Sequence, residues 1–388
     1  MSASLLSSRH ASLLLVQFLT AATPLAVIPF LSLQLEQLTG GRTAEASFWT
    51  AVAAAAPAAT AVVATPLWSR FARGREVSLL LSSTCVLTAA SYVTMAIADG
   101  AATFAIGRAL QGAAGSSIIL LLAIDGSSAR PTRGYIDLQQ AFSAGCCVGP
   151  ILGGWAFAHQ RLSVLLFFAA AALVALATAC ALLFRSAYFY PPQRREGETQ
   201  LSESVFALGG RNRVLIVAAL FGTAGAFGFI PFFAEWAMRR DAARLDSSAA
   251  GMVHASAWLA AMIVLPIWSR VIESVAATRS IAFSLLGTSA ACAALSLSAT
   301  TPWIIAFRIA HGAFHSGLNP AVYAGVRQSD EGVGELAWAR TAVTLGQILG
   351  PALCGAVVPF AGVDGALALA AGLPAVGLLV LLSVRGDR

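Results

Sequence analysis

Residues 108–116 read Arg-Ala-Leu-Gln-Gly-Ala-Ala-Gly-Ser, and residues 308–316 read Arg-Ile-Ala-His-Gly-Ala-Phe-His-Ser. The two stretches share their Arg, their first Gly, the Ala that follows it and their Ser. Nearly the same offset recurs along the chain, in Pro66-Leu-Trp-Ser-Arg70 and Pro266-Ile-Trp-Ser-Arg270, in Ile28-Pro-Phe30 and Ile230-Pro-Phe232, and in Gly149-Pro150 and Gly350-Pro351. A duplicated, apolar chain of this kind is typical of secondary transporters built from two like halves.

The composition indicates that lipid is the solvent for most of the surface. The 388 residues are 58% hydrophobic and 11% charged, and the mean hydropathy is +0.77. Soluble domains carry about 25% charged residues. The net charge of +6 comes from arginines alone, because the chain has no Lys. These arginines fall in the breaks between apolar runs, so we attribute the basic excess to membrane orientation and expect no nucleic-acid partner.

Apolar runs long enough to cross a bilayer predict an all-α membrane protein. We expect an N-terminal six-helix half over 1–184, a cytoplasmic linker over 185–212 and a C-terminal six-helix half over 213–388. The first run continues well beyond the length of a signal peptide, so we interpret it as a retained span. The twelve predicted spans are 11–35, 46–69, 77–98, 102–125, 136–158, 162–184, 213–236, 247–269, 279–298, 302–326, 336–358 and 363–384.

The arginines predict the orientation of the spans. Most of the 24 arginines lie before the first span, in the loops that follow the even-numbered spans, or after the last span. The opposite side holds Arg42, Arg161, Arg239, Arg240 and Arg244. Because loops rich in arginine stay in the cytoplasm, both termini and the linker are predicted to be cytoplasmic.

Arg108 is the strongest candidate for a functional residue. An arginine inside a span costs about 2.5–3.5 kcal/mol at mid-membrane on insertion scales, so it should face the protein interior. At helical spacing it shares one stripe with Gln111, Gly112 and Gly115, as in the wall of a cavity. A purely structural arginine that binds interhelical carbonyls is the alternative, and we favour the functional role.

A row of glycines marks the fifth span. Gly145, Gly149 and Gly153 stand four residues apart, so one helix face lacks side chains and a second helix can approach closely. Pro150 removes a backbone hydrogen bond and permits a bend. We expect Gly145, Gly149, Pro150 and Gly153 to take part in gating, although simple tight packing would give a similar row of glycines.

Together these motifs resemble the drug:proton antiporter branch of the major facilitator superfamily. Arg108-x-x-Gln-Gly112 and Gly145-x-x-x-Gly149-Pro150-x-x-Gly153 look like its fourth- and fifth-span signatures, and the fifth is associated with exporters. The whole chain is similar to bacterial multidrug-resistance efflux proteins and to siderophore exporters. The resemblance implies the major facilitator fold with 12 transmembrane helices, a bacterial inner-membrane location and proton coupling.

The resemblance also implies gating residues near the cytoplasmic face. Asp125 and Arg133 match the loop between the fourth and fifth spans, and Arg70 matches the loop between the second and third. That second loop departs from the family pattern, because Ser69 replaces its leading Gly and its usual Asp is missing. The departure puts the details of gating in doubt, but not the fold.

Proton coupling needs a group that gains or loses a proton when it is buried. Glu36 and Glu235 stand at similar heights near the outer ends of the first and seventh spans, and each is equally compatible with an ordinary interfacial Glu. His311 lies one helical turn from Arg308 and His315, and its imidazole suits a proton relay. A buried structural histidine is the more common case. We expect Arg108, Glu36, Glu235 and His311 to include the coupling groups.

Polar and aromatic side chains on the spans expected to surround the cavity are candidates for substrate contacts. They are Gln17, Gln34, Gln111, Gln140, Phe229, Arg308, His315 and Tyr323.

We therefore predict a proton-coupled exporter of a drug-like compound or siderophore, acting by alternating access as a monomer in the bilayer. A proton symporter that imports a nutrient and a non-transporting receptor or scaffold stay open as alternatives. ATP-driven transport by this chain is excluded, because a phosphate-binding loop needs a Lys. No cofactor or metal is expected, and the sequence has no constellation typical of an enzyme.

Overall fold

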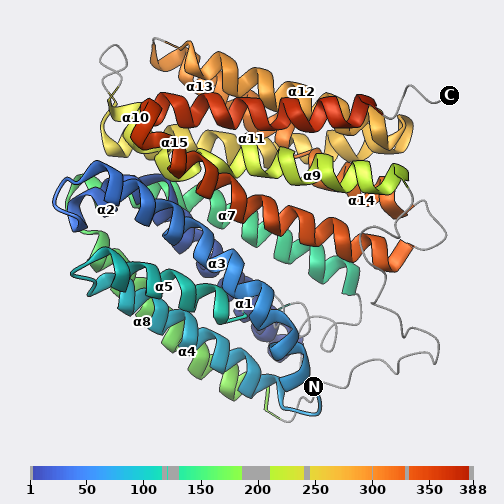
Figure 1. Cartoon of the computed structure of the whole chain (residues 1–388). Coiled ribbons are helices and arrows are strands. Elements are labelled where there is room, and N and C mark those ends of the chain that lie inside the picture. Colours follow the sequence, from blue (N-terminus) through green and yellow to red (C-terminus); the bar gives the residue numbers. More distant parts are fainter. Residues whose placement is uncertain are drawn as a thin grey trace.

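The computed structural model describes residues 3–115, 120, 131–185, 210–239, 245–298, 300–327 and 332–383, which form helices joined by short turns (Figure 1). Both halves of the repeat follow the same plan. The N-terminal half contains α1 (Ala3–Val27), η1 (Ile28–Phe30), α2 (Leu31–Leu38), α3 (Thr43–Phe71), α4 (Val77–Ala96), α5 (Ala101–Ala113), α7 (Pro131–Ala158) and α8 (Leu162–Leu183). The C-terminal half contains α9 (Gly210–Gly228), η3 (Ile230–Phe232), α10 (Phe233–Met238), α11 (Ser247–Ser274), α12 (Ala277–Ser296), α13 (Thr301–His315), α14 (Leu318–Arg327) and α15 (Gly332–Ser383).

Where the structure describes them, the predicted spans overlap these helices, and several of the helices are broken. The first and seventh spans both change to a short 3-10 turn at Ile-Pro-Phe, because the proline cannot donate the next helical hydrogen bond. The last two spans form α15, which is interrupted at Gly362, where φ is 65°. Only glycine adopts that left-handed conformation readily.

Eight helical segments in the described part of the chain are long and apolar enough to cross a membrane. The eighth, Trp338–Ser383, contains both spans of α15. The fourth span is described only up to residue 115 and at residue 120, and residues 186–209 of the predicted linker lie outside the described residues. The first helix of the C-terminal half begins at Gly210, slightly before the predicted boundary.

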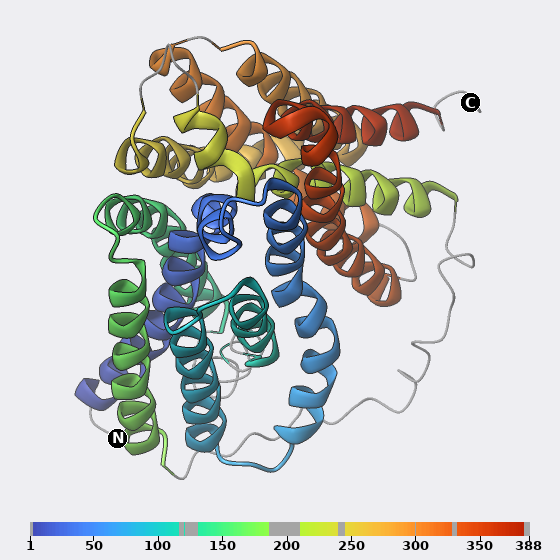
Figure 2. The ribbon, with the colours of Figure 1, turned by 60° about the vertical axis from the view of Figure 1, so that its left-hand side comes forward.

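The two halves are joined mainly by two helix pairs. Helix α7 packs on α11, and α3 packs on α15. Figure 2 shows the two groups of helices meeting where α2 and α10 lie, and in Figure 1 the start of α1 and the end of α15 lie toward the opposite end. At the meeting end η1 contacts η3, and Phe30 joins an apolar cluster with Phe229, Phe232 and Phe233 of the other half. We call this end, where α2 and α10 lie, the closed end.

Glycines set how closely the helices approach. A Cβ on Gly145, Gly149 or Gly153 would lie 1.9–2.6 Å from a carbonyl oxygen of α1, so the predicted close approach is to a helix of the same half. The contact between halves uses other glycines. A Cβ on Gly154 would lie 2.4 Å from the carbonyl oxygen of Ser247, and one on Gly251 would lie 2.2 Å from that of Pro150.

Candidate substrate cavity between the halves

A cavity of about 740 Å³ lies between the two halves. Its wall includes apolar residues such as Phe142, Phe227 and Trp258. None of the described residues that line it is Asp or Glu. The larger polar side chains in the wall are Arg108, Gln111, Gln139, Arg308, His311, His315, Asn319, Tyr323 and Gln347.

Arg108 is held in the wall by α3 and by its own helix. Its Nε–H donates to the carbonyl oxygen of Ala53 at 3.1 Å, and Nη1–H donates to Oε1 of Gln111 at 2.5 Å. The residue is only 2% exposed. Gly112 allows this approach, because a Cβ there would lie 1.9 Å from the carbonyl oxygen of Pro57 on α3. The predicted stripe therefore serves both to pack α5 on α3 and to place the guanidinium at the cavity.

Arg308 occupies the equivalent place in the other half with different partners. Its Nη2 lies 3.2 Å from Nδ1 of His254, and its Nη1 lies 3.4 Å from Nδ1 of His311. A guanidinium only donates hydrogen bonds, so each imidazole nitrogen must act as the acceptor and carry no proton. The guanidinium also lies over the ring of Phe233, 4.7 Å from its centroid. His254, which is not among the predicted site residues, is thus a direct partner of Arg308.

Three buried polar atoms near Arg308 have no hydrogen-bond partner among the described residues. They are Nε of Arg308, Nδ1 of His315 and Oδ1 of Asn319. All three residues line the cavity. Buried polar atoms are nearly always paired with protein or water, so this side of the wall has unused hydrogen-bonding capacity.

The helix breaks beside the cavity repeat in both halves. Nε1–H of Trp68 donates to the carbonyl oxygen of Ala113 at 2.9 Å, and Trp268 makes the same bond to Ala313 at 2.7 Å. Each indole covers a glycine: a Cβ on Gly115 or on Gly317 would lie 2.2 Å from the ring. The repeated Trp residues therefore cap the point where the fourth and tenth spans break.

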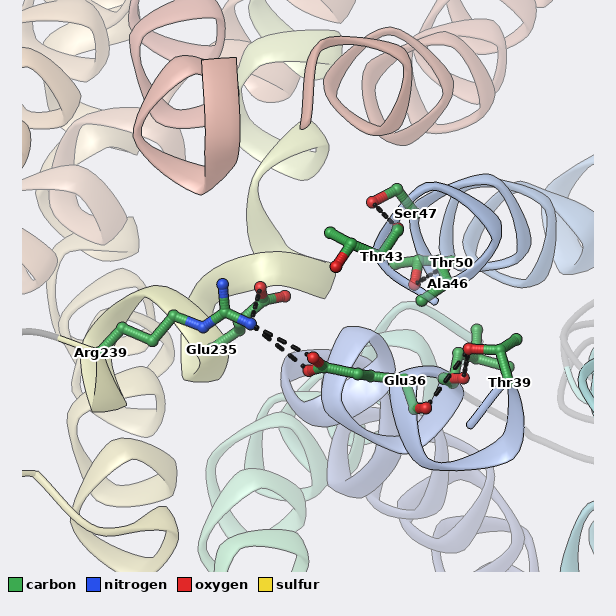
Figure 3. A network of polar contacts seen from close by, with 9 residues as sticks. Glu36, Thr39, Thr43, Ala46, Ser47, Thr50, Glu235 and Arg239 are labelled. Atoms are coloured by element: carbon green, nitrogen blue, oxygen red, sulfur yellow. Dashed lines mark hydrogen bonds and ion pairs between the residues drawn. The ribbon is translucent and has the colours of Figure 1, made fainter. Parts of the chain in front are cut away.

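An ion network links the halves at the closed end. Figure 3 shows Arg239 between Glu235, on its own helix, and Glu36 on α2. Nη2 of Arg239 lies 3.0 Å from Oε1 of Glu235 and 3.4 Å from Oε2 of Glu36. The Glu235 side chain is 7% exposed, whereas that of Arg239 is 53% exposed. The two glutamates that the sequence placed at similar heights thus meet across the interface, and the arginine between them was not foreseen as their partner.

The structure brings six of the predicted coupling and substrate residues to the cavity wall: Arg108, Gln111, Arg308, His311, His315 and Tyr323. Gln17, Gln34, Gln140 and Phe229 lie outside the wall, as do Glu36 and Glu235, so contact of these residues with a bound molecule stays a prediction. Consecutive helical residues point about 100° apart, which explains why Gln139 and Phe227 line the cavity while nearby Gln140 and Phe229 do not.

The predicted gating residues have varied surroundings. Pro150 lies within the continuous helix α7, and Arg70 is exposed at the end of α3. Asp125 and the side chain of Arg133 lie outside the described residues. Their gating role stays a prediction.

Both repeat-related helical halves contribute to the wall of this cavity, an arrangement typical of secondary transporters, and comparisons with known proteins point to the same class. The family model of the Major Facilitator Superfamily matches residues 215–388. The Staphyloferrin B transporter of Staphylococcus aureus (strain NCTC 8325 / PS 47) is 24% identical over 316 residues, which cover 79% of this chain and 75% of that protein.

Solved structures show the same fold. A bacterial homologue of the human lysosomal transporter Spinster, in an inward-facing and unoccupied conformation, has a TM-score of 0.76 at 14% identity, over 100% of this chain and 96% of its own. The peptide transporter POT has a TM-score of 0.76 at 13% identity, over 97% of this chain and 94% of its own. The chain therefore has the major facilitator fold, and its residues 215–388 resemble the sequences of that superfamily.

Proposed function

We propose that this protein is a proton-coupled exporter of a small organic molecule that works by alternating access. The observation that supports this most directly is the cavity lined by both repeat-related halves, together with the packed contacts at the closed end. A rocking motion of the halves would break the contacts at the closed end and expose the cavity there.

The direction of transport rests on two sequence features. The distribution of arginines supports cytoplasmic termini, and the closed end would then face outward across a bacterial inner membrane. In this arrangement the cavity loads from the cytoplasm. The glycine and proline pattern of the fifth span, which resembles that of exporters, favours release to the outside over uptake of a nutrient.

The coupling proton would be carried by ionisable groups on the path of this motion. Glu235 and Glu36 lie at the closed end, and His311 lies beside Arg308 in the cavity wall. Protonation of a carboxylate in the ion network would weaken its attraction to Arg239, and protonation of an imidazole would remove the acceptor that faces Arg308. Both events couple the entry of a proton to a change of contacts.

Flux measured in everted membrane vesicles under an imposed proton gradient tests the proposal. The panel pairs cationic dyes with metal-free siderophores, because the relative at 24% identity is named for a siderophore. We expect gradient-dependent uptake that is lost in Arg108→Ala and retained in Arg161→Gln, a matched loss of charge at an exposed arginine. Uptake that does not depend on the proton gradient, or no uptake of either dyes or siderophores, would overturn the proposal.

A further inference from the structure

We propose that the cavity binds an organic anion with at least two acidic groups, one held by Arg108 and one by Arg308. This inference rests on the proposed transport function and names the chemical class of the substrate. The two arginines come from opposite halves and line the same cavity. A molecule that bridges them would therefore contact both moving parts of the transporter.

The charge of the cavity is the first argument. Arg108 is 2% exposed and Arg308 is 4% exposed, and no described Asp or Glu forms an ion pair with either one. Buried charges in proteins are normally paired, because removing an ion from water costs several kcal/mol. In this cavity the missing negative charge is best supplied by the substrate. A cationic substrate would instead meet two arginines and no acidic residue among the described lining.

The geometry around Arg308 is the second argument. Its Nη atoms face the imidazoles of His254 and His311, while Nε is buried with no partner among the described residues. The planar guanidinium fork matches a carboxylate or another oxyanion in a two-bond arrangement. The guanidinium has N–H donors beyond the two that face the imidazoles, and an acidic group in the cavity would accept from them and neutralise the charge at the same time.

Arg108 offers a second anion-binding point in the other half. A guanidinium has five N–H donors. Arg108 uses Nε for Ala53 and Nη1 for Gln111, and it still forms part of the cavity wall. The bonds to the protein fix its orientation, so little side-chain freedom is lost when an anion binds.

The other residues of the cavity wall indicate which further chemical groups the ligand carries. Oδ1 of Asn319 is a buried acceptor without a partner in the described structure, so it suits a hydroxyl or amide donor on the substrate. Phe227 and Trp258 provide apolar surface beside these polar groups. A volume of about 740 Å³ is in the range of pockets that hold drug-sized molecules. The fitting class is a medium-sized polyacid that also carries hydroxyl or amide groups.

Binding of simple acids to the purified full-length protein in nanodiscs tests the inference by isothermal titration calorimetry. The probes are butyrate, the diacids from glutarate to suberate, tricarballylate, and the uncharged trimethyl ester of tricarballylate. The diacids span a range of lengths, so the series reports which separation of two acidic groups the cavity prefers. We expect at least one polyacid to bind about 10-fold or more tightly than butyrate, since a second charged hydrogen bond is worth about 1.5–3 kcal/mol.

Arg108→Gln and Arg308→Gln should each weaken binding of that polyacid about 10- to 100-fold, and Arg161→Gln should leave it unchanged. Comparable binding of the ester and the acid, or of butyrate and the best polyacid, would overturn the inference. These comparisons use the unsubstituted protein, so the test does not depend on the folding of the variants.

Flux in proteoliposomes separates this inference from the function on which it rests. If the proton gradient drives flux of tetraphenylphosphonium but of no polyacid, the proposed substrate class is wrong and proton-coupled transport is retained. Polyacid binding that depends on both arginines, without gradient-driven flux of any probe, would support the anion site and overturn the transport function.

Discussion

The ion network at the closed end predicts how Arg239→Gln shifts the conformational equilibrium. The pair between Arg239 and Glu36 crosses the interface at 3.4 Å with both side chains partly exposed, so it contributes about 0.5–1 kcal/mol. Without Arg239, the buried Glu235 loses the ion pair at 3.0 Å, which costs about 1–2 kcal/mol more. Opening of this end would hydrate Glu235 and remove that second cost. The substitution should therefore favour opening by about 1.5–3 kcal/mol, or roughly 10- to 150-fold.

Pulsed electron paramagnetic resonance between spin labels at Ala44→Cys and Ala361→Cys measures this shift. The two positions are exposed and belong to opposite halves. Five of the native cysteines are buried, and Cys147 is the partly buried one that would be replaced by Ser. We expect Arg239→Gln to add a population with a longer distance between the labels.

Arg42→Gln is the matched control for this experiment. Arg42 pairs with Glu45 at 2.7 Å on the same helix turn, so it makes an exposed pair within one half. Its loss should leave the distance distribution unchanged. An unchanged distribution in Arg239→Gln, or an equal shift in both variants, would refute the reasoning that the network holds the halves together.

Two further predictions concern the C-terminal half. Gly312→Ala places a Cβ 1.9 Å from the carbonyl oxygen of Ala257, so overpacking of α13 on α11 should destabilise the protein by about 1–3 kcal/mol. Gly372→Ala, where no atom lies within 4 Å, should not lower the midpoint of thermal unfolding, and equal midpoints for the two variants would contradict this account. His311→Gln keeps a side-chain acceptor toward Arg308 but cannot gain a proton, so substrate binding should persist while the pH dependence of flux is lost. Flux in proteoliposomes between pH 5.5 and 8 checks this, and an unaltered pH profile would exclude His311 as the coupling group.

The fold could be predicted from the sequence because hydropathy and the internal repeat give independent signals for the same architecture. The Ile-Pro-Phe pair illustrates the strength of the repeat, since both copies form the same 3-10 break in the first and seventh spans. A bilayer allows few alternatives to a helix for an apolar run of about 20 residues. Local composition was therefore sufficient to place most elements.

The site could be predicted only in part, because its contacts depend on helix rotation and on pairing between distant segments. Arg108 and Arg308 were recognisable, since a charge inside a span must face the interior. The partners of these arginines were not recognisable. His254 reaches Arg308 across 54 positions, and Arg239 reaches Glu36 across 203. Sequence spacing gives no information on such contacts unless homologous sequences are compared.

The differences between the two copies indicate a division of labour between the halves. At the offset of 200, Gln111 corresponds to His311, so the same guanidinium position faces an amide in one half and an imidazole in the other. An amide cannot change its charge between pH 5 and 8, whereas an imidazole has an unperturbed pKa of about 6.5. Arg108 is thus held by groups with fixed charge. Arg308 is held by His254 and His311, and each accepts from it only while neutral.

A proton that reaches His254 or His311 would therefore replace an accepted hydrogen bond with repulsion next to Arg308. In the same step it would add positive charge where we place an acidic group of the substrate. The two effects act in opposite directions on binding: the imidazolium attracts the anion but displaces the guanidinium that orients it. His254→Gln separates them, because it removes the charge and keeps the acceptor. If repulsion of Arg308 drives release, this variant should bind the polyacid at pH 5.5 at least as tightly as the unsubstituted protein does. Weaker binding by the variant at that pH would instead show that the imidazolium itself holds the anion.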